Sequence, residues 1–255
     1  MELYLSGSYT NSERQYLRDF GCLFLLNTYY DMRTWNKQNV IDLITIPRRS
    51  FMLDSGAFTF MNSGKKVHWK TYVDEYIAFI NKYDIQYFIE LDLYGVLGVE
   101  TTEKIRRYIE HHTGKKPIPV YHGTMPVSYF RKLCQEYPYV AISATGTLES
   151  SKWTRNKQAL KQIIKIGHSY GTKLHGLGYS RLENINKPDV LFDSVDSTSW
   201  LSGCRFGTWY DLKHGELKQK NMAGYGKHLT GVKVIKTQSK LTLFHVECVS
   251  SHIKI

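Results

Sequence analysis

The chain has 255 residues, of which 42% are hydrophobic and 22% are charged, which fits one α/β barrel or two small domains with a full core. A formal net charge of +11 favours a polyanionic partner such as nucleic acid, because each phosphate contact releases counterions. The four cysteines form no C-x-x-C pair, the N-terminus has no signal-peptide pattern, and no apolar stretch approaches the ~18 residues of a membrane span. These features argue against a zinc knuckle, a disulfide framework and a membrane partner, and we expect a cytoplasmic protein.

Eight short, mostly apolar runs follow one another along the chain, and each ends in polar residues or glycine. They cover residues 3–5, 23–26, 51–53, 87–89, 118–120, 140–142, 173–174 and 190–192. Runs of this length are typical of buried parallel strands. The segments between them carry apolar residues at helical spacing, as at Tyr72, Tyr76, Phe79 and Ile80. The alternation predicts a (β/α)8 TIM barrel over residues 1–205, with an open doubly wound sheet as the alternative.

Acidic and histidine side chains follow these runs, where each predicted strand ends. They are Asp54, Asp92, His122, His175, and the pair Asp193 and Asp196. In a barrel, the carboxyl ends of the strands form the active-site face. Carboxylates that converge there repel one another, so their pKa values move apart, as acid/base catalysis requires. All of them except Asp193 are also candidate ligands of a divalent metal, which leaves a metal-dependent hydrolase as an alternative.

The remaining residues, 206–255, are predicted to form a basic extension packed on the barrel. From Leu201 to Ile255 there are nine Lys or Arg residues against three acidic ones. Residues 232–235 and 241–246 predict a hairpin. The charge predicts contacts with a nucleic-acid backbone from Arg205, Lys213, Lys218 and Lys220. The alternative is a solvated, lysine-rich hairpin that covers an edge of the barrel.

Several stretches resemble the motifs of one enzyme family. Asp54-Ser55-Gly56-Ala57-Phe58 is similar to a D-S-G-G-F motif, and residues 120–123 are similar to a strand that ends in V-Q-G. Residues 143–146 correspond to a glycine-rich loop, 175–178 to a G-x-G, and 191–194 to F-D-[CS]. The family is the tRNA-guanine transglycosylase superfamily. Residues 194–200 resemble its phage-type branch, which includes enzymes that insert 7-deazaguanines into DNA.

The resemblance implies an enzyme that exchanges guanine in DNA or tRNA for a 7-deazaguanine through a covalent aspartyl-glycosyl intermediate. It assigns the acid/base role to Asp54. Asp196 is the expected nucleophile and Asp193 its rival, since residues three apart in a strand face opposite ways. The implied base- and substrate-binding residues are Asp92, Ser55, Gly56, Phe58, Tyr121, His122, Gly123, Gly146, His175, Gly176 and Gly178.

Two departures from the family bear on the expected partners. The family's C-x-C-x-x-C…H zinc site is absent, so no metal or cofactor is expected, and the chain is shorter than the cellular members. The resemblance implies nucleic acid and a 7-deazaguanine base as partners, and it leaves open a homodimer or a companion subunit. For a phage-encoded enzyme the expected location is the host cytoplasm. A non-catalytic nucleic-acid-binding barrel is the other alternative.

Overall fold

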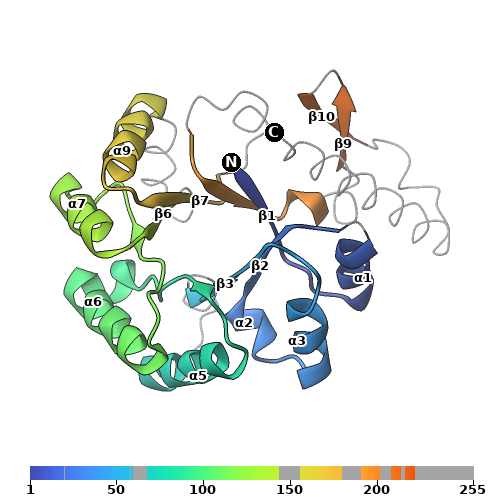
Figure 1. The fold of residues 1–255 in the computed structure, drawn as a ribbon, viewed down its shortest axis with the longest axis horizontal. Coiled ribbons are helices and arrows are strands. Elements are labelled where there is room, and N and C mark those ends of the chain that lie inside the picture. The colour runs from blue at the N-terminus through green and yellow to red at the C-terminus, as the bar shows by residue number, and fades with distance from the viewer. Residues whose placement is uncertain are drawn as a thin grey trace.

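The computed structural model describes residues 1–19, 21–57, 59, 68–143, 156–179, 191–201, 208–213 and 216–221. Parallel strands form a central ring, and helices surround it (Figure 1). The early strands lead into helices: β1 (Glu2–Ser6) into α1 (Asn11–Asp19), β2 (Phe24–Thr28) into α2 (Tyr29–Met32) and α3 (Lys37–Ile44), and β3 (Ser50–Asp54) into α5 (Trp69–Lys82).

The second half of the ring repeats this alternation. The elements are β4 (Tyr87–Phe88), α6 (Tyr94–Thr113), β5 (Val120–Tyr121), α7 (Val127–Glu136), β6 (Tyr139–Ser143), α9 (Lys157–Ser169), β7 (Lys173–Leu177) and β8 (Ser194–Ser197). A short 3-10 helix, η1 (Ser199–Leu201), follows β8. The helix expected from the periodicity of Tyr72, Tyr76, Phe79 and Ile80 is α5.

The eight strands close into a barrel. Their order is β4-β3-β2-β1-β8-β7-β6-β5, and every pairing is parallel. A parallel bridge between Ile89 and Ile118 joins the two ends of this order. Glu90 N–H donates to Ile118 O at 3.0 Å, and Ile118 N–H donates to Phe88 O at 2.8 Å. The (β/α)8 TIM-barrel prediction is therefore confirmed, and the alternative of an open sheet is not.

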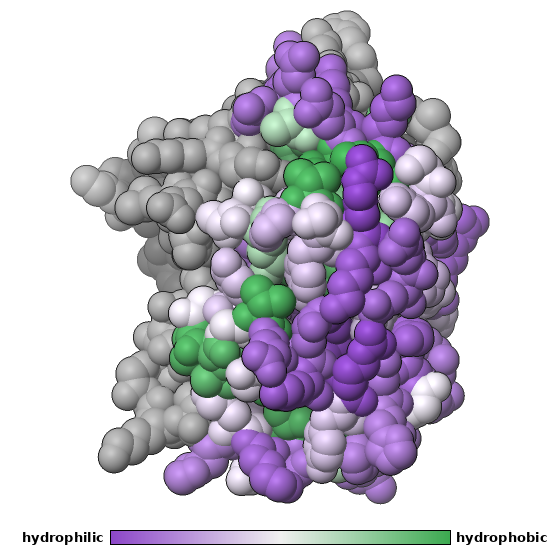
Figure 2. All heavy atoms as spheres, turned by 90° about the vertical axis from the view of Figure 1, so that its left-hand side faces the viewer, coloured by the Kyte–Doolittle hydropathy of each residue, from purple (hydrophilic) through white to green (hydrophobic). Residues whose placement is uncertain are grey.

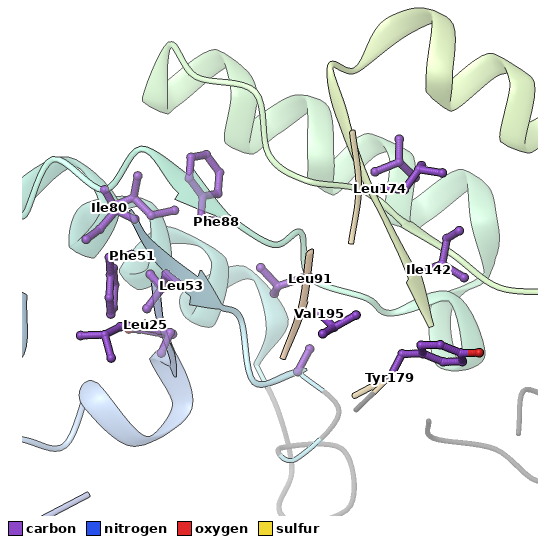
Figure 3. Close-up of a cluster of buried hydrophobic side chains, with 14 of the residues drawn as sticks. Leu25, Phe51, Leu53, Ile80, Phe88, Leu91, Ile142, Leu174, Tyr179 and Val195 are labelled. Carbon is purple, nitrogen blue, oxygen red and sulfur yellow. The ribbon is translucent and has the colours of Figure 1, made fainter. Parts of the chain in front are cut away.

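Alternate strand residues contribute to two different hydrophobic clusters. One cluster contains strand and helix residues together, such as Leu53 of β3, Val195 of β8 and Ile80 of α5, and it fills the space between the ring and the helices (Figure 3). The other cluster lies inside the ring. Its members are Tyr4, Phe24, Leu26, Met52, Ile89, Ile118, Val120, Tyr139 and Ala141. The interior is thus a packed core, and side chains that continue its face beyond the last apolar layer reach the barrel mouth.

The outward faces of the helices are polar. Figure 2 shows one side of the molecule as a mainly hydrophilic surface with small, separate hydrophobic areas. Ion pairs join α6 to α7, including Lys132–Glu103 at 2.8 Å and Arg107–Glu136. Among the described residues, no helix combines the length and the apolar character needed to cross a bilayer.

The last barrel strand lies further along the chain than the sequence predicts. The expected run was 190–192, whereas β8 begins at Ser194, where Glu2 of β1 pairs with it in register. Leu191 is 62% exposed and belongs to no strand. The apolar pattern misled the prediction because β8 places polar residues, Ser194 and Asp196, on its inner face.

Beyond the barrel, β9 (Thr208–Lys213) and β10 (Glu216–Asn221) form a separate antiparallel hairpin. The sequence did not predict this hairpin. The hairpin that it did predict, at 232–235 and 241–246, lies outside the described residues. The division into a barrel at 1–205 and an extension at 206–255 remains a prediction.

Candidate active site at the barrel mouth

Asp54 and Asp196 both face the interior of the barrel. Asp54 ends β3, two residues after Met52 of the inner cluster, and therefore shares its face. Asp196 pairs in register with Tyr4, another member of that cluster. The negative charge of Asp196 acts on Asp54 and raises its pKa. The structure thus brings together two of the residues expected to be catalytic.

The environment of Asp54 raises the pKa of this carboxyl to near neutral pH. Burial raises the pKa of Asp54 to about 7, and the like charges of Asp196 and Asp92 add to the increase. Hydrogen bonds from the backbone N–H groups of Gly56 and Ser55 act in the opposite direction, but they do not outweigh burial. A carboxyl group that titrates near pH 7 can both donate and accept a proton during a reaction.

Helix α5 holds the loop that carries Asp54. The Tyr72 hydroxyl donates to Ser55 O at 2.6 Å. The Tyr76 hydroxyl donates to Ile89 O at 2.8 Å and lies 3.3 Å from Leu53 O. Both hydroxyls are buried among aromatic rings, so they satisfy the carbonyls at the ends of β3 and β4 without water.

Two groups lie against one oxygen of Asp196. Gly178 N–H donates to its Oδ1 at 2.6 Å, and His175 Nε2 lies 3.4 Å from the same oxygen. The side chain of Asp196 is 15% exposed, so it remains accessible at the mouth. A carboxylate that is held by one oxygen and partly exposed suits nucleophilic attack.

Asp92 forms a pair with His122. His122 Nε2 lies 2.8 Å from both carboxylate oxygens of Asp92. Tyr94 stacks on the His122 ring, with the centroids 5.5 Å apart and the planes at 24°. Tyr94 is brought there by the first turn of α6, which Gly98 separates from the rest of that helix with a φ of 76°. The mouth therefore contains a carboxylate, an imidazole and a phenol ring that present polar edges beside a planar surface.

A buried ion pair supports the mouth near β4. Burial raises the pKa of Glu90 to about 7, although Arg106 opposes the increase. One Glu90 oxygen lies 3.2 Å from Arg106 Nη1 of α6, and the other accepts from Val120 N–H at 2.5 Å. Glu90 therefore joins β4, β5 and α6, and it was not among the site residues expected from the sequence.

Asp193 is not part of the group at the mouth. It precedes β8, at the amino end of the strand and on the face opposite Asp196. Its Oδ2 accepts from His168 Nε2 at 2.9 Å and from Leu174 N–H at 2.7 Å. Asp193 joins α9, β7 and β8, and the structure favours Asp196 as the carboxylate that meets Asp54.

Three expected base-binding residues have other positions. Tyr121 belongs to the outer cluster, is 1% exposed, and donates to Met125 O at 2.9 Å, because alternation in β5 turns it toward the helices. His175 is wholly buried beneath Asp196, so it does not reach a base. A Cβ on Gly176 would lie 2.9 Å from Tyr179 Cβ and 3.1 Å from the Phe192 ring. These corrections assign Tyr121 and Gly176 to packing and His175 to a role behind the mouth.

The remaining expected binding residues lie in the turn after β5, on β9 and β10, or outside the described residues. Gly123 lies in the turn that follows β5 and is partly exposed. Phe58, Gly146 and Arg205 lie outside the described residues. Lys213 lies on β9, and Lys218 and Lys220 lie on β10, where Lys218 is exposed. Their contacts with a nucleic-acid backbone remain predictions.

Two further inner residues were missed because they look like ordinary strand residues. Ser194 contacts both His175 and Tyr139 through its hydroxyl group. Alternation from Asp196 could have placed Ser194 inside the barrel, had the start of β8 been known. No pattern in the sequence distinguishes Tyr139 from the other tyrosines.

Substitution of Gly56 by alanine is expected to destabilise the fold more than the same substitution at Gly114. Both glycines have a left-handed φ, 68° and 65°, which costs a non-glycine residue about 1 kcal/mol. A Cβ at Gly56 would also lie 2.4 Å from Tyr30 Cβ, whereas one at Gly114 meets nothing within 4 Å. We therefore expect a loss of about 1 kcal/mol for Gly114→Ala and roughly 2–4 kcal/mol for Gly56→Ala. Urea unfolding followed by circular dichroism measures both, and equal losses would contradict the close approach of Tyr30.

A separate pocket of about 340 Å³ lies at the opposite end of the barrel. Arg48, Ser50 and Tyr87 line it, and the last two begin β3 and β4. The Arg48 guanidinium already donates to Ile44 O and Ile46 O. This pocket is remote from the carboxylates and is not the candidate active site.

The five residues proposed as metal ligands do not act as one set. In the part of the chain that the structure describes, no group of three or more His, Cys, Asp or Glu side chains is placed to hold a metal ion. Asp92 and His122 contact each other, while His175 contacts Ser194 and Asp196.

Comparisons with known proteins bear on the fold. No protein-family model and no curated protein matches the chain. A solved structure described as "a putative fructose-1,6-biphosphate aldolase from Coccidioides immitis" is 9% identical, has a TM-score of 0.61, and is matched over 99% of this chain and 89% of its own. A protein from Aquifex aeolicus VF5 is 12% identical, with a TM-score of 0.51 and coverage of 97% and 92%. At these identities the similarity shows the barrel fold alone.

Proposed function

We propose that this chain is a transglycosylase that exchanges guanine in DNA or tRNA for a 7-deazaguanine. The observation that carries the proposal is the approach of Asp54 and Asp196 inside one barrel mouth, with the pKa of Asp54 at about 7. Base exchange with retained configuration needs a carboxylate nucleophile and a carboxyl acid/base close to it. The resemblance of residues 54–58 and 194–200 to the transglycosylase motifs supports the same assignment.

The reaction proceeds in two displacements. Asp196 attacks C1′ of the nucleotide, so a bond forms between its carboxylate oxygen and C1′ while the C1′–N9 bond breaks. Protonated Asp54 donates its proton to the departing guanine. The incoming 7-deazaguanine then attacks C1′ through its ring nitrogen, gives up its own N–H proton to Asp54, and displaces Asp196. Both carboxyl groups return to their starting states, and no oxidant, reductant or metal takes part.

Groups around the two carboxylates have complementary roles in this proposal. Asp92 and His122 present hydrogen-bonding edges to the base, and Tyr94 lies beside them as a planar surface. A base that reaches such a pocket has left its stack or was unpaired. The net charge of +11 favours binding of the phosphate backbone.

Incubation of the full chain with a labelled 7-deazaguanine and either guanine-containing DNA or tRNA tests the proposal. The expected result is incorporation of label into one of the two nucleic acids, together with a protein–nucleic acid adduct that survives denaturation. Release of free guanine in equal amount shows that the reaction is an exchange. Metal analysis of the same preparation is the companion measurement.

Two results would overturn the proposal. Salt-sensitive binding of nucleic acid without incorporation or adduct would identify a binding barrel without catalysis. Hydrolytic activity that depends on a stoichiometric divalent metal would identify a metal-dependent hydrolase.

A further inference from the structure

We propose that His175 is a positioning residue for Asp196. In this proposal His175 donates a hydrogen bond from Nε2–H to Asp196 Oδ1, and Ser194 and Tyr139 hold His175 in that tautomer. This inference rests on the proposed function, in which Asp196 attacks C1′. It assigns a role to three polar side chains that lie inside the barrel, below the mouth, and that do not themselves touch the substrate.

The three side chains form a continuous chain of polar contacts across β6, β7 and β8. The Tyr139 hydroxyl contacts Ser194 Oγ, and Ser194 Oγ lies 2.5 Å from His175 Nδ1. His175 and Ser194 are neighbours in the register of β7 and β8. Both are wholly buried, and Tyr139 is 8% exposed. Such a chain in the barrel interior has no water to replace a missing partner, so each hydrogen has a defined direction.

Electrostatics decides that direction. Asp196 Oδ1 is a carboxylate oxygen and only accepts hydrogen bonds, so the nearby His175 Nε2 is favourable there when it carries a proton. The neutral imidazole then has an unprotonated Nδ1, which accepts from the Ser194 hydroxyl. Ser194 Oγ in turn accepts from the Tyr139 hydroxyl. Every polar hydrogen of the chain therefore points toward Asp196.

His175 Nε2 has capacity for one more hydrogen bond. This buried nitrogen makes no hydrogen bond with the described residues, although Asp196 Oδ1 is only 3.4 Å away. A buried N–H without a partner is costly, so a small movement of Asp196 toward His175 is favourable. Catalytic hydrogen bonds of free enzymes are often long and shorten when the substrate binds.

The arrangement also selects the attacking oxygen. Gly178 N–H donates to Oδ1 of Asp196, and His175 Nε2 lies 3.4 Å from the same oxygen. We therefore assign Oδ2 as the oxygen that forms the bond with C1′.

Nuclear magnetic resonance of the full chain, labelled with ¹⁵N in its ten histidines, tests the tautomer without any activity. Comparison with His175→Phe identifies the His175 signals. The expected result is a protonated Nε2 and a bare Nδ1, with an Nε2–H resonance that moves in Asp196→Asn because a neutral amide replaces the carboxylate. A protonated Nδ1 with a bare Nε2, or an Nε2–H that does not respond to Asp196→Asn, would overturn the proposal.

Base-exchange kinetics test the consequence. His175→Phe keeps a ring in the core and removes the donor, so kcat is expected to fall about 10- to 100-fold with little change in KM. Tyr139→Phe removes the hydroxyl that contacts Ser194, at the far end of the hydrogen-bonded series, and is expected to lower kcat about 3- to 10-fold.

Tyr4→Phe is the matched control. Tyr4 and Tyr139 both pack edge-on against His175, with centroid distances of 5.8 and 6.4 Å, but the Tyr4 hydroxyl donates to Ser50 at 2.8 Å. Equal kcat values for the Tyr4 and Tyr139 variants would show that the hydrogen bonds from Tyr139 through Ser194 to His175 do not contribute to catalysis. If the native protein exchanges no base at all, the proposed function fails. The tautomer of His175 and the response of its Nε2–H resonance to Asp196→Asn still test the contact between His175 and Asp196.

Discussion

Replacement of Asp196 by asparagine is expected to abolish base exchange, with a fall in kcat of about 10⁴-fold or more. The amide is nearly the same size as the carboxylate and retains an oxygen for Gly178 N–H, which lies 2.6 Å from Oδ1. It lacks the negative charge that attacks C1′, so no covalent intermediate forms. Loss of the denaturation-resistant adduct, together with loss of label incorporation, measures this effect.

Asp193→Asn is the control for that variant, since it makes the same change three residues away. Asp193 lies at the amino end of β8, where His168 and Leu174 N–H bind its carboxylate. We expect Asp193→Asn to keep kcat within a few-fold of the native value and to show its effect in stability. An active Asp196→Asn combined with an inactive Asp193→Asn would reverse the assignment of the nucleophile.

Replacement of Asp54 by asparagine is expected to lower kcat by about 10²- to 10⁴-fold, because the departing guanine then receives no proton from this position. In the native chain the free enzyme must hold Asp54 protonated, so kcat/KM is expected to decline as the pH rises through about 7. That decline should be missing from the residual activity of Asp54→Asn. A native profile that stays flat between about pH 5 and 9 would contradict the acid role of Asp54.

Asp54→Asn, which is expected to lower kcat, is expected to raise the stability of the fold above neutral pH. The pKa of Asp54 is raised from an ordinary value of 3.8 to about 7, so the folded chain binds the proton more tightly than the unfolded chain. The folded state therefore loses stability as the pH rises from about 4 to about 7, and the loss is complete above that range. Asp54→Asn removes a charge that is costly when buried, and we expect its Tm to exceed the native Tm at about pH 8 but not at about pH 4.

Much of the barrel could be predicted because local patterns and global topology agree. Seven of the eight strands fall on the runs expected for them, and the reactive residues follow those runs at the carboxyl ends. The eighth failed because β8 carries Ser194 and Asp196 on its inner face, and three of its four residues are polar. A strand that builds an active site departs from the apolar pattern by which strands are recognised.

Sequence alone determined the alternation of strands and helices, the excess of positive charge, and the identity of Asp54 and Asp196 as candidates, since these depend on residue type and spacing along the chain. Tertiary structure decided which carboxylates meet. The register of β8 against β1 turns Asp196 inward and leaves Asp193 at the far end of the strand. The tertiary structure also determined that His175 and Tyr121 are buried rather than exposed to a base. These outcomes depend on which face of a strand is turned inward, and a shift of one residue in register exchanges the two faces.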